Sequence, residues 1–343
     1  MSDFLRRDFL KLSGASAAVL GAAAPLAAAA PLAPAAAPAP AAMPGPTPYP
    51  KLSIITRYSP AKLAFAARAG YEGVVLASDE FFDPDKLSDP QIDGMLAAAR
   101  EAAIRIISIE CMWGYNHIDA DAGRRAAAQA KFIRALELGH RLGCKFVGTF
   151  SGGQRGAPME RQAAELAAAF NEKYLPVCER LDMTMGWENY PTVTNFATYP
   201  AAWKAVFAQV PSPRLGLEFD PSHLVRQYID PVRAAWEIRP RILAVHAKDT
   251  EITKPVLQEV GIHGQGWWRY RIPGQGLVDW PAFITVLLQD RFAGGIAVEH
   301  EDAFWGGNDT GEEFTQQRQD GFLLAQRFLR MYLPGRLDEA RSG

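Results

Sequence analysis

Acidic and histidine side chains stand at the ends of four short apolar runs in the C-terminal half of the chain. They are Glu188, Asp220, His246 and Glu299. Three carboxylates in one half-buried mouth repel one another, and a divalent cation turns that repulsion into binding. Such ligands suit Mn²⁺, Mg²⁺, Co²⁺ or a mixed-ligand Zn²⁺, whereas the lack of thiolate argues against a structural zinc. The alternative is ordinary cap and loop acids, but four at consecutive strand ends favour a metal site.

The elements that must position these residues begin near residue 51, where apolar runs alternate with amphipathic stretches. The runs are mostly apolar throughout, as in strands buried on both faces, and the stretches have apolar residues at helical spacing. Eight such pairs predict an α/β protein with a (β/α)8 TIM barrel, in which active sites lie at the carboxyl ends of the strands. A doubly wound open sheet is the competing topology. It requires a glycine-rich turn after the first strand, where Arg57-Tyr58-Ser59-Pro60 stands instead.

Eight strands, eight helices and one long loop are expected. The strands are Leu52–Thr56, Gly73–Ala77, Ile104–Ile109, Phe146–Phe150, Met183–Trp187, Leu215–Phe219, Ile242–His246 and Ile296–Glu299. The helices are Ala61–Ala69, Pro90–Ala103, Arg124–Leu142, Met159–Leu181, Tyr199–Val210, Pro231–Ile238, Trp280–Leu288 and Phe314–Met331. Thr250–Asp279 is expected as a long irregular connection, and such loops are usually functional.

The strand ends form a combined pattern along the chain. It runs Glu188, Asp220-Pro-Ser-His223, His246-Ala-Lys248-Asp249 and Glu299-His300-Glu301. This pattern resembles the xylose-isomerase-like TIM-barrel superfamily, and most closely its sugar phosphate isomerase/epimerase group, over residues 51–333. The resemblance implies one divalent ion, typically Mn²⁺, Mg²⁺ or Co²⁺, held by the four residues named first. It further implies a metal-dependent isomerase or epimerase acting on a sugar or keto-sugar.

Catalysis in such a site starts with removal of a proton next to a carbonyl, and the metal stabilises the enediolate that results. In related epimerases the two glutamate ligands also transfer the proton, so the resemblance makes Glu188 and Glu299 the candidate catalytic residues. A lyase or hydratase acting on 3-keto-glycosides shares this first step and is an alternative. A non-catalytic periplasmic sugar-binding protein is a second alternative, which intact metal ligands argue against.

Three further residues are candidates for substrate binding. His223 lies three residues after Asp220, at the family position that contacts substrate oxygens; a solvent-facing histidine at a helix start is the alternative. Lys248, two residues after His246, lies on the same strand face; pairing with a neighbouring acid, Asp249 or Glu251, is equally open. Arg271 belongs to a segment that resembles the one leading into the family's seventh helix.

The third strand also ends in polar and aromatic residues. Glu110 is expected to reach the substrate or support the metal, or simply to hold its loop. Trp113 and Trp187 are pocket candidates, with packing as the default role of any tryptophan. The aromatic residues within the 264–276 segment form a possible stacking wall for a sugar face.

The first 50 residues are expected to lie outside the barrel domain, which is expected over residues 51–335. Arg6-Arg7 begins a twin-arginine pattern that is followed by an alanine-dominated apolar stretch and an Ala/Pro-rich spacer. This indicates export through the twin-arginine machinery to the periplasm. Serine, glycine and proline interrupt the apolar stretch, so a stable membrane span is not expected. Export also favours an unphosphorylated sugar or glycoside as substrate.

The overall charge argues against several other partners. The formal net charge is −2, which gives no electrostatic footprint for nucleic acid. An endonuclease with this fold would need many histidines at the rim, and the chain has six histidines in all. The three cysteines form no metal-binding or disulfide pattern. The sequence leaves open whether the protein forms a homo-oligomer.

Overall fold

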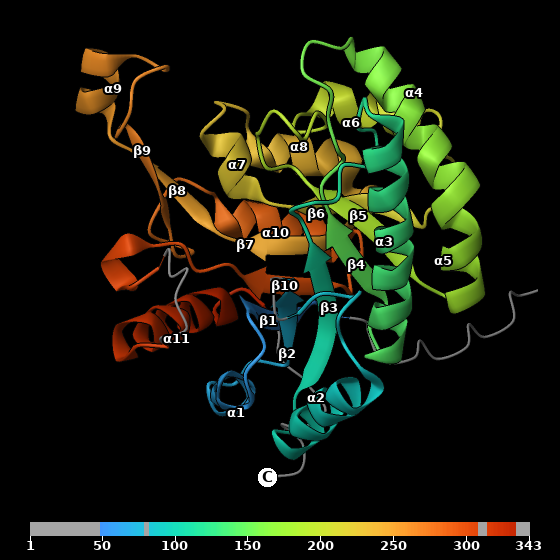
Figure 1. Cartoon of the computed structure of the whole chain (residues 1–343). Coiled ribbons are helices and arrows are strands. Elements are labelled where there is room, and N and C mark those ends of the chain that lie inside the picture. The colour runs from blue at the N-terminus through green and yellow to red at the C-terminus, as the bar shows by residue number, and fades with distance from the viewer. Residues whose placement is uncertain (1–48, 79–81, 308–313, 334–343) are drawn as a thin grey trace, which may run out of the picture. The chain divides into compact units, whose positions relative to one another are not determined.

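The computed structural model describes residues 49–78, 82–307 and 314–333. In these residues eight parallel strands close into one barrel, in the order β1-β10-β7-β6-β5-β4-β3-β2. Helices lie around the outside of the barrel (Figure 1). The predicted (β/α)8 TIM barrel is therefore confirmed. The predicted signal and most of the spacer fall outside the described residues, as does the predicted domain end at residue 335.

The observed elements follow the predicted ones closely. The barrel strands are β1 (Lys51–Thr56), β2 (Gly73–Ala77), β3 (Arg105–Cys111), β4 (Phe146–Thr149), β5 (Thr184–Glu188), β6 (Leu215–Phe219), β7 (Ile242–Ala247) and β10 (Gly295–Val298). The helices on the barrel are α1 (Pro60–Arg68), α2 (Asp89–Glu101), α3 (Ala122–Arg141), α4 (Met159–Ala169), α5 (Leu175–Leu181), α6 (Pro200–Phe207), α7 (Pro221–Val225), α8 (Pro231–Ile238), α10 (Trp280–Gln289) and α11 (Gln316–Arg330).

One predicted helix is divided in the structure. The expected Met159–Leu181 helix consists of α4, a π-helical turn at Phe170–Tyr174 and α5. Pro176 lies in the first turn of α5 and has no N–H to donate to a carbonyl of the preceding turn. The helix therefore widens for one turn before this proline.

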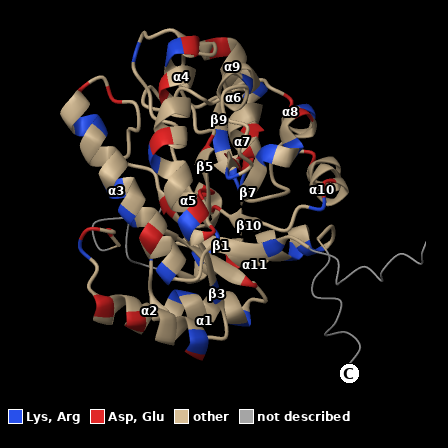
Figure 2. Cartoon of the chain, turned by 90° about the vertical axis from the view of Figure 1, so that its right-hand side faces the viewer, with Lys and Arg blue, Asp and Glu red and all other residues tan. Residues whose placement is uncertain are grey.

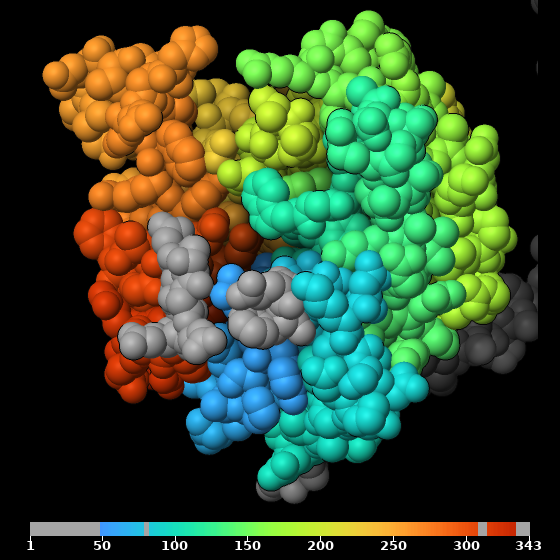
Figure 3. Space-filling model, in the orientation of Figure 1, coloured from blue at the N-terminus to red at the C-terminus, as the bar shows by residue number. Residues whose placement is uncertain are grey.

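The connection over Thr250–Asp279 is more regular than the sequence indicated. It contains two antiparallel strands, β8 (Asp249–Ile252) and β9 (Trp268–Arg271), and between them the helix α9 (Lys254–Val260). The side chains of Glu251 and Arg269, which are paired across the two strands, form an ion pair at 2.8 Å. We call this segment, residues 249–271, the arm. Figure 3 shows it in orange, standing out from the outline of the barrel.

The core leaves the barrel interior free for polar groups. Large apolar side chains fill the layer between the strands and the surrounding helices. Inside the barrel, a small separate cluster of Ile55, Val75 and Ala297 occupies one side. Glycines such as Gly148 and Gly186 line other interior positions, where an added Cβ would meet neighbouring atoms. Buried polar side chains such as Glu110, Glu218 and His246 occupy further interior positions.

The outer surface is mixed in charge. Figure 2 shows Lys and Arg interspersed with Asp and Glu over the face in view. Among the helices of the described segments, none combines the length and apolar character needed to cross a bilayer.

Candidate metal centre

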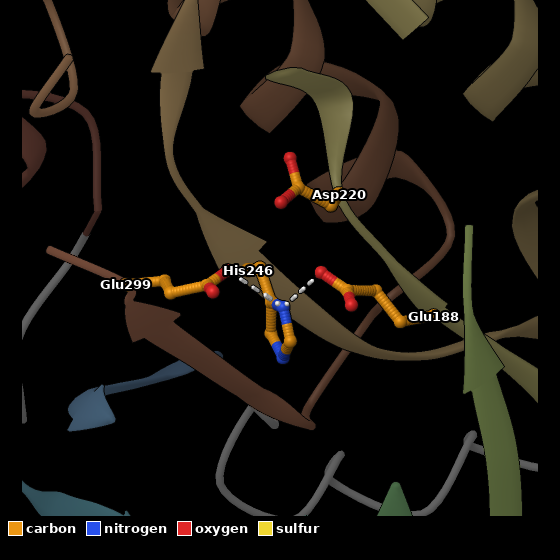
Figure 4. A group of neighbouring side chains, drawn as sticks. All are labelled: Glu188, Asp220, His246 and Glu299. Carbon is orange, nitrogen blue, oxygen red and sulfur yellow. Dashed lines mark hydrogen bonds and ion pairs between the residues drawn. The ribbon is translucent and has the colours of Figure 1, made fainter. Parts of the chain in front are cut away.

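Four side chains from successive strand ends meet at the carboxyl-terminal mouth of the barrel. Glu188 ends β5, Asp220 follows β6, His246 lies on β7 and Glu299 follows β10. One oxygen or nitrogen from each residue lies within 4.8 Å of the corresponding atoms of the other three. Figure 4 shows Glu188 and Glu299 on opposite sides of His246, with both carboxylates turned toward its ring.

The sheet register and one amide fix these positions. On β7 and β10, His246 pairs with Ala297, so alternation turns Glu299 toward the barrel mouth as well. Asn189 links the neighbouring strand ends, because its amide donates to the Asp220 carbonyl and accepts from the Asp220 N–H, each at 2.8 Å. Asp220 then caps α7 by accepting a hydrogen bond from the Ser222 N–H at 2.7 Å.

The donor set fits a divalent cation. The Oδ2 atom of Asp220 is buried and accepts no hydrogen bond in the described structure, although Lys248 Nζ and His223 Nε2 each lie 3.2 Å from it. A buried carboxylate oxygen without an aligned donor favours a cation or a proton beside it. Three carboxylates and one imidazole nitrogen within coordination reach of one point provide a hard to borderline ligand set.

Electrostatic coupling favours the ionised form of Glu188. The Nδ1 atom of His246 lies 2.9 Å from Glu188 Oε1 and 3.1 Å from Glu299 Oε2. Burial alone would lower the pKa of His246, but the carboxylates around it, Glu218 foremost, raise that pKa well above its ordinary value. Burial opposes ionisation of Glu188 too, but His246 and His223 hold its pKa well below the usual range.

Lys248 lies inside the same cluster and is fully buried. Its Nζ atom is 2.7 Å from Glu299, 2.9 Å from Glu301 and 3.2 Å from Asp220. The alternative in which Lys248 pairs with Asp249 or Glu251 is therefore wrong, and its role in substrate binding stays a prediction. Against the effect of burial, the Lys248 ammonium lowers the pKa of Glu299 to about 2. The ammonium thus already neutralises part of the carboxylate charge that would attract a divalent cation.

His223 is buried against two of the candidate ligands rather than facing solvent, so the solvent-facing alternative is wrong. Its Nε2 atom lies 3.1 Å from Glu188 and 3.2 Å from Asp220. Its Nδ1 atom lies 2.9 Å from the Tyr270 hydroxyl, which accepts a hydrogen bond from Arg226. The arm therefore reaches the metal centre through Tyr270. A role of His223 in substrate binding stays a prediction.

Arg271, also on the arm, is held by acidic neighbours. Its guanidinium forms ion pairs with Glu251 at 2.6 Å and with Asp302 at 2.8 Å. The carboxylate of Asp302 also accepts a hydrogen bond from the Ile272 N–H. These contacts anchor the arm to the loop after β10, and the predicted substrate contact of Arg271 stays a prediction.

The rings of Trp113, Phe150, Tyr190 and His223 form a connected set near the mouth, which we call the aromatic wall. Trp113 is 67% exposed, and its ring meets those of Phe150 and Tyr190 edge-on at 5.2 and 6.2 Å. Tyr190 in turn lies 5.0 Å from the ring of His223. A chain of ring contacts thus connects an exposed tryptophan to the candidate ligands. Trp187 instead is buried and donates to the Ala197 carbonyl, which is a packing role.

Beneath His246 lie Glu110, a candidate from the sequence, and Glu218, which was not among the predicted site residues. The Nε2 atom of His246 is 2.9 Å from Glu110 and 3.2 Å from Glu218. Burial raises the pKa of Glu218 to about 8, and burial raises that of Glu110 as well. Strand alternation was the available signal, because Glu218 lies two residues before Asp220 and shares its face.

The sequence comparisons identify the family. Residues 63–329 match the family described as xylose isomerase-like TIM barrel. The chain belongs to this family. Among curated proteins, an uncharacterized Bacillus subtilis (strain 168) protein, YfiH, is 33% identical over 100 residues, which are 26% of this chain and 32% of that protein. The match thus spans about a third of that relative.

Solved structures of this xylose isomerase-like fold align over most of the chain. The D-allulose 3-epimerase of a Methylomonas species, solved with D-allulose, has a TM-score of 0.62 and 16% identity over 83% of this chain and 98% of its own. The mannonate dehydratase of Streptococcus suis serotype 2 has a TM-score of 0.65 and 15% identity, over 83% and 94%. The E. coli 3-keto-D-glucoside 4-epimerase has a TM-score of 0.62 and 15% identity, over 81% and 99%. At these identities the alignments show a shared fold.

Proposed function

We propose that this protein is a divalent-metal-dependent isomerase or epimerase that acts on a sugar or keto-sugar by moving a proton on a carbon next to a carbonyl. The observation that carries the proposal is the placement of two ionised carboxylates, Glu188 and Glu299, on opposite sides of His246 (Figure 4). Family membership and the sugar-modifying enzymes among the aligned structures support it.

The two glutamates supply proton transfer from opposite sides of the substrate. An ionised carboxylate is the form that accepts a proton, and both pKa values are held low by neighbouring cationic groups. One glutamate removes the proton, and the other takes up a proton from solvent and returns it to the opposite face of the same carbon. The first glutamate then releases its proton to solvent. Transfer to opposite faces inverts the configuration of that carbon, which is epimerisation.

A divalent ion bound by Glu188, Asp220, His246 and Glu299 would supply Lewis acidity toward the carbonyl oxygen, and Mn²⁺ is the ion we favour among Mn²⁺, Mg²⁺, Co²⁺ and Zn²⁺. Lys248 offers a fixed positive charge beside the carbon that reacts, since its ammonium already contacts Glu299 and Asp220. His223 presents a ring nitrogen to the same space and orients substrate hydroxyls.

A lyase or hydratase acting on 3-keto-glycosides is the second candidate. It shares proton removal next to a carbonyl and differs in that a group then leaves the next carbon. The aromatic wall from Trp113 to His223 favours it, because a glycoside has a second group that stacks on an exposed ring.

We also propose that the protein is exported to the periplasm by the twin-arginine route. In that compartment free sugars and glycosides are the available substrates. Retention of an Arg6→Lys, Arg7→Lys double variant in the cytoplasm, compared with periplasmic wild type, tests this.

Proton exchange in D₂O tests the proposed function. Ketoses and 3-keto-glycosides are incubated with the Mn²⁺- or Mg²⁺-loaded protein and followed by NMR. We expect deuterium at one carbon next to the carbonyl, and release of an aglycone if the reaction is an elimination. Glu188→Gln and Glu299→Gln each remove exchange, whereas Glu301→Gln, which lacks a contact with His246, reduces it less. Absence of exchange from every substrate, with metal bound, would instead favour a sugar-binding protein.

A further inference from the structure

The lower edge of the His246 ring faces two carboxylates that the proposed metal centre does not use. The Nε2 atom lies 2.9 Å from Glu110 Oε1 and 3.2 Å from Glu218 Oε1. All three side chains are at least nine-tenths buried. The upper edge of the same ring, at Nδ1, faces Glu188 and Glu299. The imidazole therefore stands between an upper and a lower pair of carboxylates.

The lower pair occupies space that the neighbouring strand keeps open. Gly148 on β4 pairs with Glu110 on β3, and a Cβ at Gly148 would come within 2.0 Å of Glu218 Oε2. A cavity of about 380 Å³ lies toward the amino-terminal ends of the strands and is lined in part by Glu218. In a TIM barrel this volume is usually filled by branched apolar side chains. This part of the barrel therefore has less apolar packing than is usual, and it holds a buried carboxylate instead.

The lower contacts are close but not aligned. The atoms His246 Nε2, Glu110 Oε1 and Glu218 Oε2 are buried without a hydrogen-bond partner in the described structure. Nε2 therefore lies within reach of both carboxylates without an aligned hydrogen bond to either. Such buried polar atoms are costly unless a proton or a cation joins them.

We propose that Glu110 and Glu218 are positioning residues that keep the proton of His246 on Nε2, so that Nδ1 is free to bind the divalent ion. This inference rests on the metal centre of the proposed function. A metal-bound imidazole keeps one ring proton, and the partner of the nitrogen that stays protonated decides which nitrogen coordinates. With the carboxylates of Glu110 and Glu218 as the two acceptors that face Nε2, the proton stays there and the ring keeps its orientation.

A second cation bound by Glu110, Glu218 and Nε2 is the competing use of the same atoms, because they also lie within coordination reach of one another. It requires His246 to lose both ring protons and bridge two ions. One ring proton shared with two carboxylates needs no such deprotonation. We therefore assign the lower pair to His246 and treat the second ion as an outcome of the test.

A titration with Co²⁺ distinguishes the positioning role of Glu110 and Glu218 from a second metal site. The apo-protein is titrated with Co²⁺, and affinity, stoichiometry and the visible spectrum are recorded. We expect about one ion per wild-type chain and an affinity about 10- to 100-fold lower in Glu218→Leu. Glu218→Gln recovers much of the affinity, because its amide oxygen still accepts from Nε2. Gly148→Ala, whose Cβ displaces the Glu218 carboxylate, resembles Glu218→Leu.

Matched variants and NMR distinguish positioning from general destabilisation. Asp249→Asn alters a buried carboxylate that accepts hydrogen bonds from the Thr250, Gly274 and Val278 N–H groups and the Trp280 indole, and we expect it to lower stability but not Co²⁺ affinity. In the Zn²⁺-loaded protein, ¹⁵N spectra report which nitrogen of His246 carries the proton. We expect a slowly exchanging Nε2–H in wild type and a faster-exchanging Nε2–H in Glu218→Leu, because an acceptor that faces this proton is then missing.

Each other outcome decides a different point. Two ions per wild-type chain, falling to one in Glu218→Gln, would overturn the positioning role in favour of a second metal site. Equal Co²⁺ affinity in wild type and Glu218→Leu, while His246→Ala binds none, would overturn it and leave the proposed metal centre intact. A wild-type protein that binds no Co²⁺ refutes both. Reduced affinity in Glu218→Leu, with no proton exchange on any sugar, supports the positioning role and refutes the reaction.

Discussion

Buried histidines in the two halves of the barrel have opposite surroundings. His246, on β7, lies among four carboxylates contributed by β3, β5, β6 and the end of β10. His117 follows β3 in the other half, where its ring nitrogens meet the hydroxyls of Tyr174 at 2.7 Å and Thr149 at 3.0 Å. The ring also lies 4.9 Å from that of Phe132. Both histidines are almost completely buried.

The difference shows that surroundings, rather than burial, decide what a buried histidine does. Burial lowers the pKa of His117 to about 3, because nothing near it rewards the positive charge. Carboxylates raise the pKa of His246 despite equal burial. The first arrangement keeps a neutral ring as a hydrogen-bonded part of the core. The second arrangement attracts protons or cations. We therefore place the reaction in the half of the barrel that contains His246, which we call the chemical half.

Removal of the two rings gives the largest expected contrast. His246→Ala is expected to lose at least about 100-fold in Co²⁺ or Mn²⁺ affinity, because a ligand that faces two others is gone. His117→Ala is expected to keep wild-type affinity but to lose about 2–4 kcal/mol of unfolding free energy through a cavity and lost hydrogen bonds. Metal titration and urea unfolding measure the two effects. Equal metal affinity in both variants would remove the distinction between the halves.

Acid stability is the next test of the contrast. Since the folded pKa of His117 is about 3 and the ordinary value is 6.5, the unfolded chain binds a proton between these pH values and the folded chain does not. The stabilisation from the neutral ring is thus complete above about pH 6.5 and falls by about 1.4 kcal/mol per pH unit as the pH is lowered toward 3. The stability difference between wild type and His117→Asn should narrow by that amount per unit. A constant difference from pH 7 to pH 4 contradicts it.

Lys248 tests how the chemical half balances its charges without a bound ion. In Lys248→Met the contacts to Asp220, Glu299 and Glu301 lose their cation, so the apo-protein should unfold at lower temperature. Divalent-ion affinity should rise about tenfold, because a competing positive charge is gone. Lys248→Arg, which keeps the charge, is the matched control and should bind the ion nearly as wild type does. Weaker ion binding by Lys248→Met would mean that the lysine supports the metal ligands instead of competing with them.

The four candidate metal ligands could be predicted from the sequence, whereas the side chains and the arm around them could not. Glu188, Asp220, His246 and Glu299 could be grouped because parallel strands bring their carboxyl ends to one rim. The partners of Lys248 and Arg271 could not be predicted, since they depend on side-chain reach between loops distant in the chain. Glu218 was missed because it lies one layer below the rim. The arm was missed because its two short strands are separated by a helix rather than by a tight turn.

The smallest expected effect concerns the exposed end of the aromatic wall. Trp113 is 67% exposed, so Trp113→Ala should change the unfolding free energy by less than about 0.5 kcal/mol. If the wall holds the second group of a glycoside, the same variant should weaken binding of a 3-keto-glycoside several-fold, measured as KM or by titration, and leave binding of a free ketose unchanged. Trp236→Ala, which removes a 47% exposed tryptophan on α8, is the matched control and should affect neither ligand. Equal weakening of ketose and glycoside binding by Trp113→Ala would place the first sugar ring on the wall. The opposite half of the barrel would then contribute directly to the reacting substrate, rather than only to its attached group.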